Sequence, residues 1–96
     1  MYTIAFLSAV RKDIKRLDKR LKEKIRNEEI RKIEKDPYIA EPLSSCFKGL
    51  WSYHFSYEGT EYRIVYEIYP KEKIVLIIMI RKREKFYEVL KRRIIG

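Results

Sequence analysis

The hydrophobic residues change their spacing halfway along the chain, and this change limits the fold more than any other feature. The first half carries an apolar stripe at intervals of four, three and four residues, formed by Val10, Ile14, Leu17 and Leu21. This spacing predicts a helix with one buried side. Apolar residues continue to Lys35, but the spacing slips after Leu21, so we expect two antiparallel helices with a break near residues 18–21. Asp36–Pro37 should end the second helix, because the residue before a proline avoids the helical region.

The second half is rich in aromatic and β-branched residues, a composition typical of strands. Three segments carry it: Leu50–Tyr57, Glu61–Tyr69 and Lys73–Arg81. The connections between them are short enough to be hairpins, so these segments predict an antiparallel meander. The alternating segment Tyr2–Phe6 predicts a further strand, and residues 38–49 are expected to form a loop.

The sequence also indicates where the first helix begins and that a further helix lies near the C-terminus. The hydroxyl of Ser8 can accept a hydrogen bond from the free amides of the first helical turn, which predicts a cap. A C-terminal helix is indicated by apolar residues that share one side: Phe86, Val89, Leu90 and Ile94. The predicted order β-α-α-β-β-β-α describes one α+β domain over residues 1–96. In it an antiparallel sheet packs against an N-terminal helical hairpin and a C-terminal helix, and one sheet face stays free for a partner or substrate.

The chain is strongly basic. Its 96 residues include 23 Lys and Arg against 14 Asp and Glu, a formal charge of +9, and residues 11–35 alone carry twelve basic and six acidic side chains. This charge favours a polyanionic partner, because Lys and Arg displace counterions from a phosphate backbone. The alternative is a charge-rich surface of the thermophile type, and the two interpretations are compatible.

Several kinds of site are excluded by residue type. One cysteine, Cys46, and one histidine, His54, allow neither an internal disulfide nor a zinc cluster of the usual kind. The sequence has no Gly-rich phosphate loop, nucleophile elbow or Ser/His/Asp set, and its acidic residues are scattered among lysines. We therefore expect no metal and no cofactor. The apolar run Ile74–Ile80 is too short to span a membrane and the N-terminal segment too short for a signal sequence, so a cytoplasmic protein is expected.

Three motifs follow one another in the second half. They are Gly49-Leu-Trp-Ser-Tyr-His54, Glu61-Tyr-Arg-Ile-Val-Tyr-Glu67 and Arg81-Lys-Arg-Glu-Lys-Phe-Tyr87. In this order and at these spacings the chain resembles the RelE/ParE toxin superfamily over nearly its whole length, and Tyr62–Tyr66 is the most specific piece. The resemblance implies a RelE-like fold, a toxin of a type II toxin–antitoxin system and a cognate antitoxin as partner.

The resemblance to the RelE branch further implies a metal-independent endoribonuclease that cleaves mRNA, with the ribosome as a second partner. Metal-free RNA cleavage needs a base for the 2′-hydroxyl, charge stabilisation at phosphorus and a proton for the 5′-oxygen. We expect Arg63 to stabilise the phosphorane and Arg83 to hold the same phosphate or assist the leaving oxygen. His54 is the expected acid or base, since histidine is the residue type whose unperturbed pKa lies near neutrality. Tyr87 is expected to stack on a base or to transfer a proton.

The same reasoning gives an RNA-binding set around these residues: Lys48, Arg81, Lys82 and Lys85. Strand alternation places Arg63 and His54 on one face if their strands are in suitable register. It places the aromatic residues of the segment Leu50–Tyr57 in the core: Trp51, Tyr53 and Phe55. Lys82 stands where many relatives have histidine, and lysine is a poorer proton donor and acceptor at neutral pH. Each charged residue also has an ordinary structural alternative, such as a salt bridge between Arg63 and Glu61 or Glu67.

Two other functions remain open from the sequence. ParE-type relatives share the fold and inhibit DNA gyrase, but they generally lack the basic catalytic cluster, so Arg63, Arg83 and Tyr87 argue against that branch. A degenerate toxin that retains only antitoxin binding is the third possibility.

Overall fold

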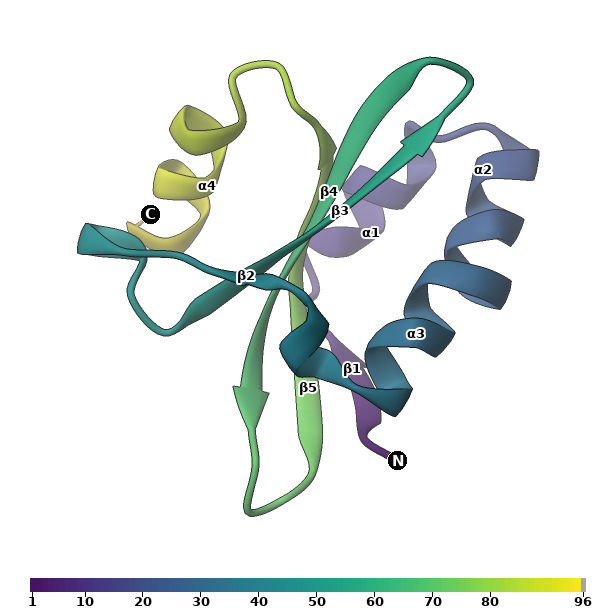
Figure 1. Ribbon diagram of the computed structural model, residues 1–96. Helices are drawn as coiled ribbons and strands as arrows, with labels where there is room; N and C mark the ends of the chain where they lie inside the picture. The colour runs from purple at the N-terminus through teal and green to yellow at the C-terminus, as the bar shows by residue number, and fades with distance from the viewer. Residues whose placement is uncertain (96) are drawn as a thin grey trace.

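The computed structural model describes residues 1–95 and contains a five-stranded sheet with helices on both sides (Figure 1). The strands lie in the order β1-β5-β4-β3-β2, with bounds β1 Thr3–Phe6, β2 Glu41–Pro42, β3 Leu50–Tyr57, β4 Thr60–Tyr69 and β5 Ile74–Lys82. The helices are α1 Val10–Lys15, α2 Lys19–Lys24, α3 Ile30–Lys35 and α4 Phe86–Ile95. The predicted α+β class and the meander β3–β4–β5 are confirmed.

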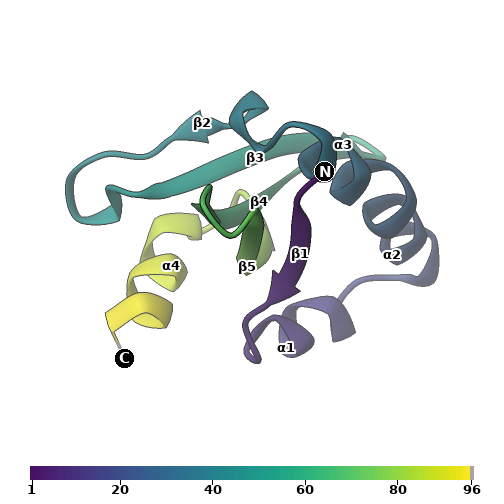
Figure 2. The same ribbon diagram turned by 90° about the horizontal axis from the view of Figure 1, so that it is seen from below.

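The sheet is mixed rather than antiparallel throughout. β1 pairs with β5 in parallel, with Thr3 opposite Ile74 and Phe6 opposite Ile77. Parallel neighbours need a long crossover, and the whole stretch from α1 to β4 lies between these two strands in the chain. Figure 2 shows how strongly the sheet twists, since β1 runs steeply to β3.

The predicted loop 38–49 is partly wrong. Glu41–Pro42 forms the short edge strand β2, which pairs antiparallel with β3, and the single turns η2, Pro37–Ile39, and η3, Ser45–Phe47, flank it. A two-residue strand containing proline carries no alternating pattern, which explains why the sequence does not reveal it.

The helical break is confirmed, and Asp18 begins the second helix. Its carboxylate accepts a hydrogen bond from the Leu21 amide at 2.8 Å. The predicted cap at Ser8 is wrong, because α1 begins after Ala9 and shows no side-chain cap. The amide of Arg11 instead bonds the carbonyl oxygen of Ser8 at 3.2 Å.

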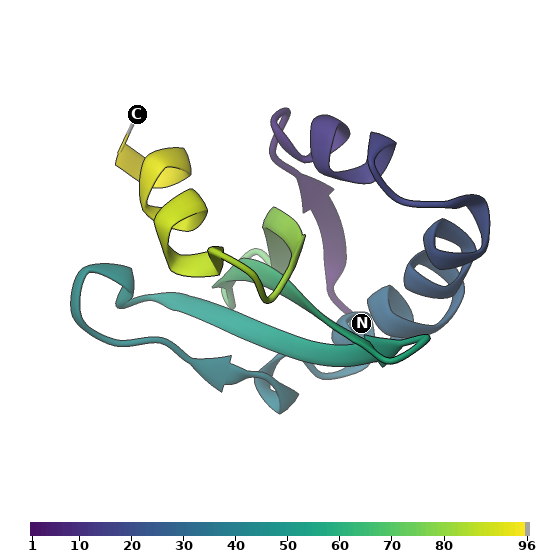
Figure 3. The same cartoon turned by 90° about the horizontal axis from the view of Figure 1, so that it is seen from above.

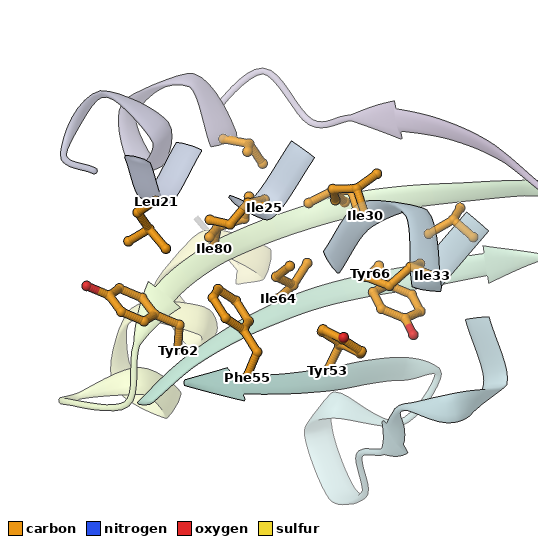
Figure 4. Packing of buried hydrophobic residues seen from close by; sticks show 13 residues of the cluster. Leu21, Ile25, Ile30, Ile33, Tyr53, Phe55, Tyr62, Ile64, Tyr66 and Ile80 are labelled. Atoms are coloured by element: carbon orange, nitrogen blue, oxygen red, sulfur yellow. The ribbon is translucent and has the colours of Figure 1, made fainter. Parts of the chain in front are cut away.

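The slip in hydrophobic spacing has a local cause. Residues Ile25–Glu29 form η1, a π-helical turn that joins α2 to α3. A π-turn holds one more residue than an α-helical turn, so Ile30 follows Ile25 at an interval of five and still faces the same side. Figure 4 shows the result: Leu21, Ile25, Ile30 and Ile33 all point toward the sheet.

Two cores lie on opposite faces of the sheet. α1, α2 and α3 cover the first, where Tyr53, Phe55 and Ile64 are buried and Trp51 packs partly buried against them (Figure 4). The second core lies under α4 and contains Leu50, Val65, Ile78, Met79, Phe86 and Leu90. Figures 1 and 3 show α4 on one side of β4 and β5 and the other helices on the other side. The expected free face is therefore only partly free.

None of the helices within residues 1–95 combines the length and apolar character needed to cross a membrane.

Candidate functional site

One histidine and two arginines form a row across the sheet on the face that carries α4. The register sets His54 of β3 opposite Arg63 of β4, and Arg63 opposite Arg81 of β5. Side chains of directly opposite residues share one face, so the predicted common face of His54 and Arg63 is confirmed. Like charges directly opposite one another are destabilising, and a bound anion would relieve the repulsion between the two arginines.

A β-bulge creates this alignment. Val65 pairs with Met79 and Tyr66 with Ile77, so Ile78 is an extra residue in β5. With regular pairing, Ile80 would stand opposite Arg63 in place of Arg81. Two side chains satisfy backbone groups at the bulge: the Asp13 carboxylate accepts from the Ile80 amide at 3.0 Å, and Arg93 donates to the Ile78 carbonyl at 3.1 Å.

Arg63 is held by aromatic rings. Its guanidinium carbon lies 4.9 Å from the ring centre of Phe86 and 5.7 Å from that of Tyr87, both in the first turn of α4. No salt bridge joins Arg63 to a carboxylate among the described residues, so the alternative pairing with Glu61 or Glu67 is not observed. Its Nε atom is buried and makes no hydrogen bond there. A guanidinium that no carboxylate among the described residues neutralises, and that borders a cavity, is suited to an incoming anion.

The cavity beside Arg63 brings together half of the predicted site residues. It has a volume of ≈ 420 Å³ and is lined by Arg63, Arg83, Lys85, Phe86, Tyr87 and Glu88. Three predicted catalytic residues and one predicted RNA-binding residue thus share one open hollow. Phe86, expected on the apolar side of the C-terminal helix, also borders it.

His54 lies on the same face but outside the lining of that cavity. Two carboxylates flank its ring: Glu61 Oε1 lies 3.5 Å from Nδ1, and Glu41 Oε2 lies 3.7 Å from Nε2. The other oxygen of Glu61 lies 3.8 Å from Nη1 of Arg83. Sequence reasoning did not assign Glu41 or Glu61 to the site, and the strand register is the signal that identifies them.

The remaining RNA-binding candidates are dispersed. Lys82 pairs with the buried Tyr62 and therefore lies on the opposite face from Arg63, at a second cavity beside α1. Arg81 also borders that second cavity, and its Nε donates to the Glu84 carbonyl at 3.3 Å. Lys48 is exposed and does not line the Arg63 cavity, although the adjacent Phe47 ring lies 5.6 Å from Tyr87.

Within residues 1–95, no three His, Cys, Asp or Glu side chains gather in a way that could hold a metal ion. The chemistry available to this surface is that of guanidinium, ammonium, imidazole, phenol and carboxylate groups.

The chain is similar to known toxins in sequence and in fold. A family model described as ParE-like toxin of type II bacterial toxin–antitoxin system matches residues 4–91. The RelBE2 toxin–antitoxin complex of Mycobacterium tuberculosis contains a chain with 25% identity and a TM-score of 0.72, covering 85% of this chain and 98% of that one. No curated protein sequence matches significantly.

Two further solved structures share the fold. A doubly substituted Escherichia coli RelE toxin in the free state has 19% identity and a TM-score of 0.73, covering 98% of each chain. A chain of the archaeal RelE–RelB complex from Pyrococcus horikoshii has 19% identity and a TM-score of 0.62, covering 88% of this chain and 97% of that one.

Proposed function

The chain belongs to the ParE-like toxins of type II bacterial toxin–antitoxin systems, within the RelE/ParE superfamily, and from this premise we propose that it is a metal-independent endoribonuclease that cleaves mRNA. The observation that carries the proposal is the state of Arg63. Its guanidinium lies against the Phe86 and Tyr87 rings, has no carboxylate partner among the described residues and opens on a cavity shared with Arg83 and Lys85. Residues 1–96 form one toxin domain in this proposed function.

The cavity residues suit one phosphodiester in its transition state. Arg63 and Arg83 donate to the non-bridging phosphate oxygens, where negative charge increases as the 2′-oxygen attacks. His54 takes the proton of the 2′-hydroxyl, the O2′–P bond forms, and the P–O5′ bond breaks to leave a 2′,3′-cyclic phosphate. The departing 5′-oxygen takes a proton from water. Tyr87, which is 49% exposed, offers a ring on which a base can stack.

The proposed partners follow from the family and the charge. The M. tuberculosis and P. horikoshii relatives are in toxin–antitoxin complexes, and we extend to this chain a cognate antitoxin that keeps it inactive. The basic surface, +9 overall, suits mRNA and ribosomal RNA, and translation would place its action in the cytoplasm.

The test is cleavage of mRNA on translating ribosomes, and of free RNA, by the purified protein in the presence of a metal chelator. We expect products with 2′,3′-cyclic phosphate ends, and a loss of about 10²–10³-fold in rate for Arg63→Ala, the scale of removing one transition-state donor. Arg92→Ala is the matched control, because Arg92 is exposed on α4 and does not line the cavity. Equal cleavage by wild type and Arg63→Ala would refute the site.

Because the matching family model is described as ParE-like, gyrase inhibition is the second candidate function. A gyrase poison would accumulate cleaved DNA complexes with purified gyrase and leave mRNA intact. The unneutralised Arg63 and the cavity around it favour the nuclease, because a protein that only binds gyrase does not need a guanidinium placed for phosphate chemistry.

A further inference from the structure

Glu61 contacts two residues of the proposed site at once. It lies two residues before Arg63 on β4, so the two side chains share the α4 face. One carboxylate oxygen lies 3.5 Å from His54 Nδ1 and the other 3.8 Å from Arg83 Nη1. The Glu61 side chain is 40% exposed, against 73% for Arg83. Glu61 is thus much less exposed than Arg83 and about as exposed as His54, at 36%.

The backbone fixes where this carboxylate lies. Glu61 pairs with Ser56 and Arg63 with His54, so Glu61 and His54 are diagonal neighbours on adjacent strands, within reach of a glutamate side chain. The register comes from the two-residue turn Glu58–Gly59, in which both residues have positive φ, 47° and 77°. The carbonyl of Glu61 also accepts from the Arg83 amide at 3.1 Å, which anchors the turn after β5.

We infer that Glu61 is a positioning residue that fixes the orientation and tautomer of His54; the inference rests on the proposed nuclease function. A neutral imidazole carries one proton, and the carboxylate beside Nδ1 favours the tautomer with the proton on that nitrogen. Nε2 is then free to take the proton of the 2′-hydroxyl. The imidazolium that forms is stabilised by the same carboxylate, which does not itself become protonated.

The other groups around the ring are consistent with this role. Glu41 lies 3.7 Å from Nε2, but its side chain is 71% exposed and belongs to the two-residue edge strand β2. Arg63 stands directly opposite His54 on β4. Glu61 is both nearer to the ring than Glu41 and less exposed, so it determines which nitrogen holds the proton. Its exposed pair with Arg83 adds little stability, which leaves Arg83 available to a phosphate.

The experiment compares Glu61→Gln with Glu67→Gln. Glu67 lies on the same strand and, by alternation, the same face, and its carboxylate accepts from the Tyr69 hydroxyl instead of contacting His54. Both variants remove one negative charge. Because His54 is the only histidine, ¹⁵N-histidine labelling reports one imidazole, and its two ring-nitrogen shifts give the tautomer at a pH where the ring is neutral.

For Glu61→Gln we expect a shift of the His54 tautomer away from the Nδ1-protonated form. We also expect kcat to fall about 10- to 100-fold with little change in KM, part of the ~10²–10⁴-fold that a positioned acid–base group contributes. Glu67→Gln should match wild type in both measurements.

An unchanged tautomer in Glu61→Gln would overturn the inference even in an active nuclease. A raised KM with unchanged kcat would also overturn it, because Glu61 would then act on binding through Arg83. If the wild-type protein cleaves no RNA, the proposed function fails, and the imidazole shifts still show whether Glu61 fixes His54.

Discussion

At the scale of single residues, Arg63 is held in place by shape as well as by charge. The Phe86 and Tyr87 rings contact a planar guanidinium, and a lysine has neither the plane to stack nor the fork to hold two phosphate oxygens. We therefore expect the cleavage rate of Arg63→Lys to fall about 10²-fold or more, nearly as far as that of Arg63→Ala, although the charge is kept. Single-turnover cleavage of a defined RNA measures this, with circular dichroism as the check on folding. Activity near the wild-type level would show that charge alone suffices.

Glu29 is the residue for which the structure predicts a pH effect on stability. It is 1% exposed, and its carboxylate accepts from the Tyr53 hydroxyl at 2.6 Å and from the Lys24 ammonium group. Burial by itself would raise the pKa of Glu29, but the two hydrogen bonds outweigh it and hold the pKa below its ordinary value of 4.5. A pKa lower in the folded than in the unfolded chain stabilises the fold above the unfolded value, and this contribution disappears as the pH falls through the folded one.

We accordingly expect the free energy of unfolding to decline below about pH 4.5 and to decline less steeply in Glu29→Gln. Urea unfolding between about pH 6 and about pH 3 provides the measurement. Glu23→Gln, at an exposed position of α2, is the control. Identical pH slopes for Glu29→Gln and wild type would contradict the assignment.

At the scale of the elements, the π-helical turn η1 makes a prediction about chain length. One extra residue in Ile25–Glu29 keeps Ile25 and Ile30 on the same side. Deletion of the exposed Asn27 should therefore leave a regular helix with the same buried face, and a cooperative thermal transition. Deletion of the exposed Arg31, inside the regular α3, would rotate the buried Ile33 by about 100° away from the core and should cause unfolding. Circular dichroism measures the thermal transition of each variant. An equal loss of stability in the two deletion variants would contradict the role given to η1.

The sequence predicted elements better than it predicted faces. Strand β3 lies where its aromatic alternation predicted, since one of its faces is apolar and the other polar. The run Ile74–Ile80 is apolar at every position because both faces of β5 are buried, so no alternation reveals the bulge at Ile78. The side of the sheet on which Lys82 lies was for that reason beyond sequence reasoning.

Some residues of the candidate site could be predicted from the sequence, and others could not. Arg63, Arg83 and Tyr87 belong to recognisable motifs and meet in one cavity. The involvement of Glu61 and Glu41 depends on which residues of three strands stand opposite one another, and residue type alone does not supply that register.

At the scale of the whole molecule, an ion pair joins the two helical layers. Arg93 of α4 donates to the carboxylate of Asp13 in α1, with Nη2 at 2.9 Å from Oδ1, and Asp13 is 8% exposed. Removing one partner of a buried pair leaves the other charge unneutralised, whereas removing both does not. Asp13→Ala should therefore lower the free energy of unfolding by about 3–5 kcal/mol.

The double variant Asp13→Leu, Arg93→Leu should lose less than Asp13→Ala, and Lys12→Ala, exposed on the same helix, should lose little. Urea titration of the variants measures these differences. If the loss in free energy of unfolding of the double variant equals the sum of the losses of the two single variants, the two residues do not act as a pair.

The extra residue in β5 also has a consequence for how such proteins diverge. The bulge at Ile78 determines which face of the sheet each later residue of β5 occupies. A relative with the same residues but no bulge would therefore have Ile80 opposite Arg63. Its length, charge and fold would be unchanged, and a hydrocarbon chain would stand where a second guanidinium now does. Two relatives with nearly the same sequence would in this way differ in whether two guanidinium groups face each other across β4 and β5.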